Sequence, residues 1–220
     1  MNFRMIINYD KKYLFVHIPR SAGTNLYNVL SGEKYDITNK NSKIFKGGPP
    51  DPGGHYFTRK IISSHEDGGY DIKDFTIFSI VRNPYDRLHS EYWMREEWNK
   101  NTVVSKFQTW LLNPTEPPAH AGWDIGDSWN KQPQKTCMLD WLTDIDGNII
   151  VDHILRYENL MEELKELSKI IDEPNLLNIS REKRNNSPTR PSYKQAYTEG
   201  MINFVKEFHK KDLEFFGYEF

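Results

Sequence analysis

Cysteine is almost absent from this sequence, and its scarcity excludes two kinds of site. The 220-residue chain contains a single cysteine, Cys137. One cysteine forms neither an internal disulfide nor a CxxC redox or zinc motif, so we expect a reducing, cytoplasmic setting. Long hydrophobic runs are absent as well, because no stretch of about 18 apolar residues occurs. We therefore expect neither a signal peptide nor a membrane span.

The sequence also lacks an excess of either charge. Its 29 lysine and arginine residues nearly balance 31 aspartate and glutamate residues, giving a formal net charge of -2. This balance excludes a globally basic nucleic-acid-binding protein. It is a sum over opposite regions, since residues 1–30 carry +3, residues 181–194 carry +4 and residues 140–173 carry -7. An anionic small-molecule ligand is therefore compatible with the net charge.

Hydrophobic periodicity alternates along the chain between strand and helix patterns. The expected strands are residues 13–18, 61–64, 75–81 and 149–156; the expected helices begin near Ser21 or Thr24, at Pro84, and at 102–112, 159–171 and 198–211. This alternation predicts a mostly parallel α/β sheet, which binds ligands at the carboxyl ends of its strands. We expect loops at residues 39–54 and 113–129, and a single domain over residues 1–220, because 37% hydrophobic residues suffice for one core.

The segment HIPRSAGTN follows the first strong strand and has the composition of an anion-binding turn. Gly23 allows close backbone approach to a ligand, N–H groups at a helix start converge on an anion, and Ser21 and Thr24 add hydroxyl donors. Arg20 adds a fixed positive charge. The GxxxxGK[ST] pattern of a Walker A loop is absent, and a glycine turn between strand and helix also occurs in proteins without a ligand.

A second polar segment follows the central strand FTIFSIV. Arg82 stands at the end of that strand, and Ser90 lies eight residues later in the expected helix. Both side chains suit a second anionic group, although Arg82 has an alternative partner in Asp86. Two anion-competent segments after two strands favour a ligand with phosphate-like groups at two places.

The residues of these two segments carry a resemblance to a known family. FVHIPRSAGTNL resembles the phosphosulfate-binding loop of sulfotransferases (FxHIPKTxGTSL-like), and FTIFSIVRNPYDRLHSEYW resembles their 3′-phosphate-binding strand and helix (VRNPxxRxxSxYY-like). VDHILRYENLMEEL and HKKDLEFFGYEF resemble the late strand and helix and the carboxyl-terminal ending of the family. The match is nearer to the carbohydrate branch, which includes heparan 2-O-sulfotransferase-like proteins, than to the phenol and steroid enzymes.

The resemblance implies a P-loop-like, three-layer α/β/α fold and an enzyme that uses 3′-phosphoadenosine 5′-phosphosulfate (PAPS). Its sulfuryl group would pass to a hydroxyl or amine of a carbohydrate-like or small-molecule acceptor. The residues implied to bind the 5′-phosphosulfate are Arg20, Ser21, Gly23, Thr24 and Asn25, and those implied to bind the 3′-phosphate are Arg82 and Ser90. The family usually has lysine where this chain has Arg20, which keeps the positive charge but spreads it over a planar fork.

Transfer of a sulfuryl group requires a base for the acceptor proton, and the resemblance favours His65. Carbohydrate-type enzymes often carry a histidine before the 3′-phosphate motif, and imidazole titrates near neutrality. Glu66, Asp67 and His55 are alternatives, and a surface histidine without a role is the other interpretation of His65. The mechanism needs no metal, and the seven histidines show no HExxH or similar ligand spacing, so we predict none.

The basic segment 181–194 and the tryptophans leave several interpretations open. A solvated basic loop is one interpretation of the segment; a late loop that contacts the donor, as in related enzymes, is another. In the second case the contacts would come from Arg184, Ser187, Arg190 or Lys194. Trp123 and Trp129 lie in a polar loop and are the tryptophans we expect to be exposed.

Two other functions compete with a sulfotransferase. A P-loop kinase would need a Walker-type lysine and a magnesium-binding acid at a strand end, and neither is clear in the sequence. A non-catalytic nucleotide-binding protein would keep both anion-binding loops and lack a working base. The predicted partners are the nucleotide and an acceptor molecule, with no nucleic acid.

Overall fold

The computed structural model describes residues 6–31, 45–46, 57–69, 71–98, 106–113, 134–179 and 190–220. They fall into two compact units, which we describe one at a time. The first unit contains the described residues up to Val81 and those from Met138 to Ile179. The second contains the described residues from Arg82 to Asn113, from Gln134 to Cys137 and from Arg190 to Phe220. A single domain over the whole chain stays a prediction.

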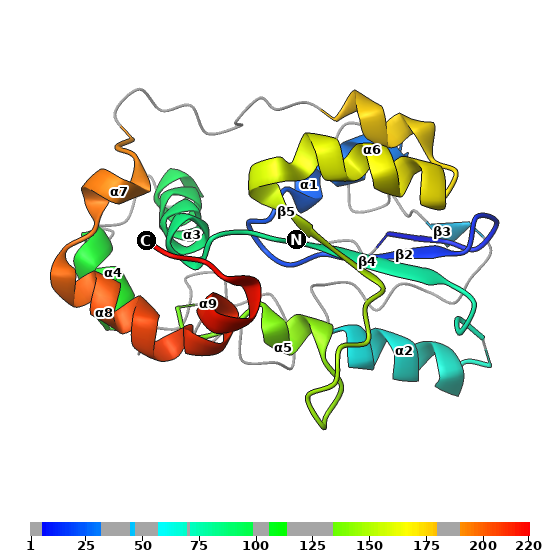
Figure 1. The fold of residues 1–220 in the computed structure, drawn as a ribbon, viewed down its shortest axis with the longest axis horizontal. Coiled ribbons are helices and arrows are strands. Elements are labelled where there is room, and N and C mark those ends of the chain that lie inside the picture. Colours follow the sequence, from blue (N-terminus) through cyan, green and yellow to red (C-terminus); the bar gives the residue numbers. More distant parts are fainter. Residues whose placement is uncertain are drawn as a thin grey trace. The chain divides into compact units, whose positions relative to one another are not determined.

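A five-stranded sheet in the order β3-β1-β2-β4-β5 forms the centre of the first unit (Figure 1). Strand β2 pairs in parallel with β4, and β4 pairs in parallel with β5, whereas β1 runs antiparallel to β2. Strand β3 pairs in parallel with β1. The strand bounds are Ile6–Asn8 for β1, Tyr13–Val16 for β2, Phe45–Lys46 for β3, Thr76–Val81 for β4 and His153–Arg156 for β5. The sheet is therefore mostly parallel, as predicted.

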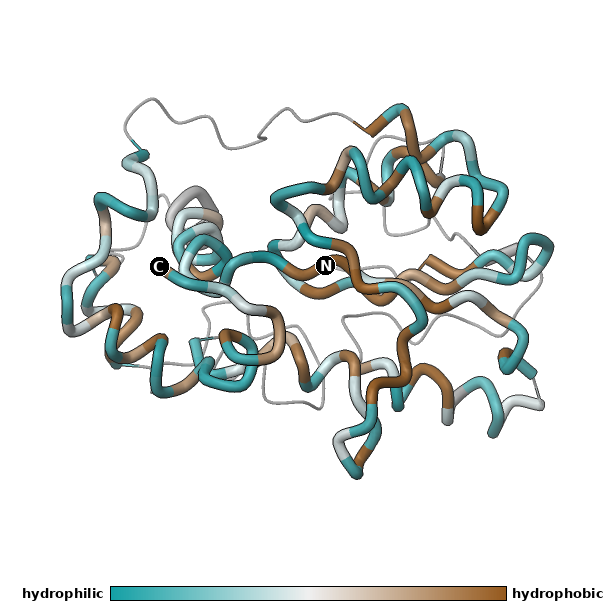
Figure 2. The backbone as a smooth tube through the Cα atoms, viewed as in Figure 1, coloured by the Kyte–Doolittle hydropathy of each residue, from teal (hydrophilic) through white to brown (hydrophobic). Residues whose placement is uncertain are grey.

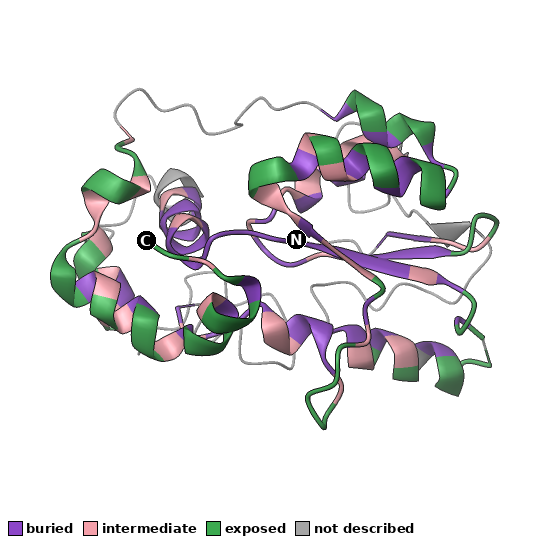
Figure 3. Ribbon diagram, viewed as in Figure 1, coloured by how far each residue is buried: buried purple, intermediate pink, exposed green. Residues whose placement is uncertain are grey.

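Helices cover both faces of this sheet, as Figure 1 shows. Helix α1 (Gly23–Ser31), helix α6 (Leu160–Ile170) and the 3₁₀ helix η2 (Pro174–Asn178) lie on one face, and α2 (Thr58–Asp67) and α5 (Leu139–Leu142) lie on the other. The central strands are hydrophobic (Figure 2) and buried (Figure 3), as expected of strands covered on both sides. The predicted three-layer α/β/α class is confirmed.

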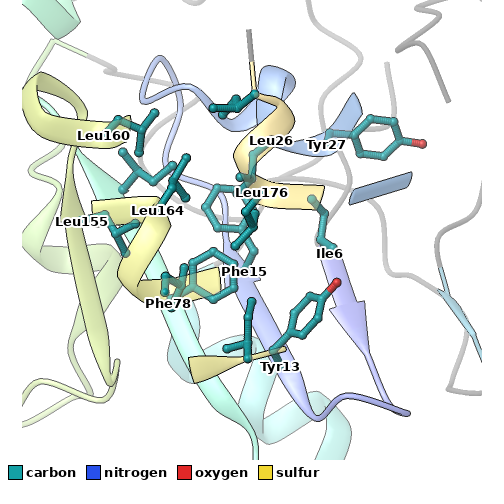
Figure 4. Packing of buried hydrophobic residues seen from close by; sticks show 14 residues of the cluster. Ile6, Tyr13, Phe15, Leu26, Tyr27, Phe78, Leu155, Leu160, Leu164 and Leu176 are labelled. Carbon is teal, nitrogen blue, oxygen red and sulfur yellow. The ribbon is translucent and has the colours of Figure 1, made fainter. Parts of the chain in front are cut away.

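The main core lies between the sheet and the helices α1, α6 and η2. Figure 4 shows the aromatic rings of Phe15 and Phe78, from β2 and β4, below leucines of α6 and η2. Leu164 and Leu176 in this cluster are completely buried. The leucine stripe of the predicted helix 159–171 is therefore a core face, as its helical spacing indicates.

The predicted strand at residues 61–64 is wrong, because these residues belong to helix α2. Phe57, Ile61 and His65 are spaced four residues apart and are all buried, which is the period of a helix face. Four residues are too few to distinguish a strand from one turn of a helix. The pair Phe45–Lys46 also forms a short strand within the segment 39–54, where we expected a loop, and β1 was not predicted.

The second unit consists of helices. Helix α3 (Pro84–Trp98) begins at the proline that the sequence indicated, and α4 (Phe107–Leu112) lies within the expected helix 102–112. The predicted helix 198–211 is two helices, α8 (Glu199–Phe208) and α9 (Lys210–Phe216), which are preceded by the short helix α7 (Tyr193–Ala196). The break falls at His209, a buried residue whose Nε2 lies 2.6 Å from the carbonyl oxygen of Gln134.

The core of this unit joins α3, α4 and α8. Its buried members are Tyr85, Leu88, Leu111, Met201 and Val205. Met201 and Val205 belong to the apolar stripe that the sequence places on the last helix. Among the described helices of both units, none has the length and apolar character needed to cross a membrane.

Two adjacent leucines of η2 test the core assignment. Leu176 is fully buried and Leu177 is 48% exposed. We expect Leu176→Ala to lower the free energy of unfolding by about 2–5 kcal/mol, because the truncation leaves a cavity. Leu177→Ala, the matched control, should change it by about 0.5 kcal/mol or less. Urea denaturation measures both values, and equal losses would contradict the assignment of this face to the core.

Candidate functional site

The segment after β2 turns sharply into helix α1, and two of its residues have left-handed backbone conformations. Arg20 has φ 68° and Ala22 has φ 62°. A residue with a Cβ pays on the order of 1–3 kcal/mol for this conformation, and such strain concentrates at binding sites. Left-handed residues separated by one position direct successive N–H groups toward one side of the chain, which is the geometry of an anion-binding nest.

Several donors of this segment have no acceptor in the part of the chain that the structure describes. The hydroxyl of Ser21 is buried and has no hydrogen-bond partner there. The N–H groups of Ala22, Gly23 and Thr24 donate to no described residue, because the first helical hydrogen bonds come from the N–H groups of Asn25 and Leu26 to Ala22. Buried donors are normally paired, so these groups mark a place for an acceptor.

Gly23 is required by its contact with His17. A Cβ added to Gly23 would lie 1.9 Å from the His17 ring, which also stacks on Phe15 at 5.8 Å between centroids. The imidazole thus fills the space that a larger residue at position 23 would need. Sequence reasoning identified Gly23 and missed His17, whose position in HIPR at the end of the strand was the available signal.

The segment after β4 begins with a partly buried ion pair. Arg82 donates from Nε and Nη2 to Oδ2 of Asp86, at 2.8 and 2.6 Å. This is the alternative partner that the sequence suggested for Arg82. Asn83 accepts a hydrogen bond from the N–H of Tyr85 on its side-chain oxygen, which caps the start of α3. Ser90 lies two turns further along α3 and is buried.

Arg190 comes from the late basic segment and lies beside α3 within the second unit. Its Nη2 atom is 3.4 Å from Nδ1 of His89, the residue before Ser90. Burial, together with the charges of Arg190 and Arg82, lowers the pKa of His89 to about 4, while the charge of Asp86 opposes them. Ser90, one of the predicted 3′-phosphate residues, thus follows a residue of α3 that contacts Arg190, and the other, Arg82, lies two residues before the helix begins.

Arg87 was missed by sequence reasoning, although it stands in the RNPYDR segment. It is fully buried, and its Nη2 donates to the carbonyl oxygen of Thr136 at 2.8 Å. Burial lowers the pKa of this guanidinium, and the charges of Asp212 and Glu91 oppose that effect. The side chain therefore braces the interior of the second unit through its bond to Thr136.

Cys137, His209 and Asp212 form a buried group whose ligand atoms lie within 4.8 Å of one another. These residue types bind metals, but the group fits a metal poorly. The Cys137 thiol donates to the Phe208 carbonyl at 3.1 Å, and the buried Arg87 guanidinium interacts electrostatically with both Cys137 and Asp212. A cation in that position already balances the Asp212 charge, so we assign the group to the core.

His65 lies on α2 and is not brought together with the segment after β2. Its ring is 6.2 Å from that of Tyr9, which lies 5.5 Å from Phe75, immediately before β4. Tyr9 and Phe75 precede β2 and β4, so His65 lies at the end of the sheet where these two strands begin. Residues 17–22 follow the other end of β2. The Nδ1 atom of His65 lies 2.7 Å from the Ile61 carbonyl oxygen, to which it donates, and the buried Nε2 has no partner among the described residues.

Glu66 and Asp67, the alternatives to His65, are exposed on the same helix. Lys194 is exposed on α7, and Thr24 and Asn25 lie half-buried at the start of α1. Several sequence-based candidates lie outside the described residues: His55, Arg184, Ser187, Trp123 and Trp129.

A small cavity of about 280 Å³ lies in the first unit near the turn between β1 and β2. Three of its polar side chains are paired with one another, since the Tyr13 hydroxyl lies 3.4 Å from Glu173 and the Lys11 ammonium 3.3 Å from the same carboxylate. Burial and the Glu173 charge raise the pKa of Tyr13 to about 12, while a hydrogen bond from Asn8 opposes them. The phenol therefore stays neutral, and we assign the cavity to the supporting structure.

A mostly parallel sheet between two helical layers, with a nest after β2 and an arginine after β4, defines an α/β protein with two elements suited to anions. Residues 3–219 match the model of the sulfotransferase family. This match covers nearly the whole chain, so the protein belongs to the sulfotransferase family and is a transferase. No curated protein and no solved structure matched the sequence.

Two glycine substitutions test the contact between His17 and Gly23. We expect Gly23→Ala to lower the free energy of unfolding by about 1–3 kcal/mol, because the new methyl group overlaps the imidazole. Gly200 in α8 has open space around its Cα, so Gly200→Ala should raise stability by about 0.4–1 kcal/mol. Thermal and urea unfolding of both variants measure the difference, and a stabilising Gly23→Ala would contradict the close approach of the two residues.

Proposed function

We propose that the protein transfers the sulfuryl group of PAPS to a hydroxyl or amine of an acceptor molecule. The observation that carries this proposal is the segment after β2. It combines left-handed residues at positions 20 and 22 with a Ser21 hydroxyl and N–H groups at the start of α1 that have no acceptor among the described residues. A phosphosulfate supplies the acceptor oxygens that these donors lack, and the family match covers this segment.

In the proposed reaction an acceptor oxygen attacks the sulfur in line with the bond to the 5′-phosphate oxygen. A new S–O bond forms, the bond between sulfur and the bridging oxygen breaks, and adenosine 3′,5′-bisphosphate (PAP) leaves with the bonding electron pair. The acceptor proton passes to a base. Negative charge grows on the leaving phosphate, and Arg20 together with the N–H groups of Gly23 and Thr24 would stabilise it. Asn25 and Ser21 would complete the contacts to this group.

The 3′-phosphate is proposed to bind through Arg82, Ser90 and Arg190. Arg82 and Arg190 supply positive charge near α3, and their shared influence on His89 supports placing both near one ligand group. Asp86 holds Arg82 in a fixed orientation through two hydrogen bonds. A doubly charged phosphate would compete for the outer face of the same guanidinium, which is the usual chemistry of arginine in phosphate sites.

The acceptor is proposed to be a carbohydrate-like or small molecule. This choice rests on the resemblance of the motifs to the carbohydrate, heparan 2-O-sulfotransferase-like branch. The family match supports the broader class, the sulfotransferase family. A cytoplasmic setting, which rests on the single cysteine, and the absence of a metal requirement, which rests on the mechanism and the histidine spacing, stay predictions.

Binding of PAP tests the donor assignment. At a concentration 100 times its Kd, a ligand stabilises a protein by about 2.7 kcal/mol, so PAP should raise the Tm by several degrees. We expect Arg82→Ala to remove most of this shift. Differential scanning fluorimetry with and without PAP measures it, and ATP at the same concentration should have a smaller effect.

Lys210→Ala is the control for Arg82→Ala, because it also removes one positive charge from the second unit at an exposed position. This variant should retain the full PAP shift. If PAP leaves the Tm of the folded wild-type protein unchanged, the donor assignment is wrong. A larger shift with ATP than with PAP would instead favour a kinase.

Transfer itself and the base are tested together. The protein is incubated with labelled PAPS and a panel of sugar and small-molecule hydroxyls, and mass analysis detects an added sulfuryl group. His65 is the base that the sequence predicts. The Nε2 atom of His65 has no partner among the described residues, which supports that role. His65 lies where β2 and β4 begin, at the opposite end of the first unit's strands from the segment after β2, and this position argues against the role.

If His65 is the base, His65→Gln abolishes most transfer, by about 100-fold or more, at unchanged PAP affinity. Ser63→Ala, which changes an exposed residue of the same helix, is the control and should retain activity. Unchanged transfer by His65→Gln would assign the base to another residue and leave the donor assignment intact.

A further inference from the structure

His89 lies in the second unit between an indole and a guanidinium. It stands on α3 and is 1% exposed. The indole Nε1 of Trp93 donates to its Nε2 at 2.8 Å, and Nη2 of Arg190 lies 3.4 Å from its Nδ1. Phe107 packs edge-on against the ring at 5.3 Å between centroids. Both ring nitrogens thus face defined groups in a buried setting.

The partners of the ring determine its tautomer. An indole nitrogen is a donor only, so Nε2 of His89 must be the acceptor in the bond from Trp93. A neutral imidazole with an unprotonated Nε2 carries its proton on Nδ1. The charged form is disfavoured because it would place a proton on Nε2 against the Trp93 N–H, in agreement with the lowered pKa of His89.

This tautomer places two donors opposite each other. The Nδ1–H of His89 faces Nη2 of Arg190, and a guanidinium has no acceptor atom. Two N–H groups at this separation do not bond to each other, but both can donate to one oxygen placed between them. Asp86, the acid whose charge acts on the pKa of His89, accepts its side-chain hydrogen bonds from Arg82, and in the described part of the chain no hydrogen bond joins it to the His89 ring.

We propose that His89 is a phosphate-binding residue, whose Nδ1–H donates together with Arg190 to an anionic oxygen of the nucleotide 3′-phosphate. The inference rests on the proposed function and adds a residue to it that sequence reasoning passed over. Trp93 is then a positioning residue, because its bond to Nε2 selects the tautomer that donates.

The surroundings favour an anion over a neutral acceptor. Arg82 and Arg190 are both close enough to His89 to affect its charge, and Asp86 is the opposing acid among the groups that act on it. Among the described groups whose charges act on the pKa of His89, two are positive and one is negative. Since Phe107 and Trp93 cover the imidazole, its donor lies in a poorly hydrated place where a charge-assisted hydrogen bond is strong.

Two substitutions of His89 separate the functions of its nitrogens. Nδ1 is bonded to Cγ, as the amide nitrogen of asparagine is, whereas Nε2 lies one bond further out, as the amide group of glutamine does. His89→Asn therefore retains a donor near the Nδ1 position. His89→Gln retains a partner for Trp93 and loses the donor.

Isothermal titration of the full chain with PAP and with adenosine 5′-phosphate, which lacks the 3′-phosphate, tests the inference. We expect His89→Gln to weaken PAP binding about tenfold or more and to leave adenosine 5′-phosphate binding unchanged. His89→Asn should bind PAP within about threefold of the wild type. The Arg190→Gln variant should reproduce the selective loss of PAP binding.

The possible outcomes are distinct. If wild-type protein prefers PAP and His89→Gln keeps that preference, the role of His89 is wrong and the proposed function stands. An equal loss for both nucleotides also overturns it, because the effect would not depend on the 3′-phosphate. If wild-type protein binds PAP no better than adenosine 5′-phosphate, both the inference and the 3′-phosphate site of the proposed function fail.

A second measurement needs no substitution. Nitrogen-15 NMR of the wild-type protein distinguishes the two imidazole tautomers of His89, which the His89→Gln spectrum assigns by the missing signals. We expect a protonated Nδ1 and an unprotonated Nε2 at neutral pH, and the Nδ1–H signal should shift when PAP is added and not with adenosine 5′-phosphate. A proton on Nε2 would overturn the inference.

Discussion

The parallel pairing of β2 with β4 is the constraint on which the first unit depends. Val16 lies opposite Ser79, and the buried Ser79 hydroxyl donates to the Val16 carbonyl oxygen at 2.8 Å. This bond satisfies the last backbone acceptor of β2 at the point where the chain leaves the sheet. The parallel arrangement also requires a crossing connection between the strands, and helices α1 and α2 lie on opposite faces within it.

Beyond Val16 the stable core supports a segment that is locally unfavourable. Two residues with a Cβ adopt left-handed conformations, and the Ser21 hydroxyl is buried without a described partner. The His17 ring against Gly23 and the buried Leu26 of α1 hold this segment in place from both ends. Folding energy from the apolar layers thus maintains a set of donors that have no acceptor among the described residues.

Much of this fold could be predicted wherever a sequence pattern involves neighbouring residues and extends over a whole strand or helix. The strand FTIFSIV follows from its run of β-branched and aromatic residues. The helix that starts at Pro84 follows from a proline at the first helical position. The strand prediction for residues 61–64 was wrong for the opposite reason, because four residues are too few to distinguish a strand from one turn of a helix. The break of the last helix at His209 depends on a bond to Gln134, 75 residues away, which no local pattern contains.

The sequence by itself determined which residues follow the strands, and therefore the chemistry of the two segments that we propose to bind anions, and the family. Tertiary structure decided how those residues are used: Arg87 is buried and braces the second unit, His65 lies where β2 and β4 begin, and Arg190 meets His89 across 101 residues. The reason is physical. Local periodicity and residue type report backbone conformation and functional groups, whereas burial, tautomer and opposing donors arise only when distant segments pack together.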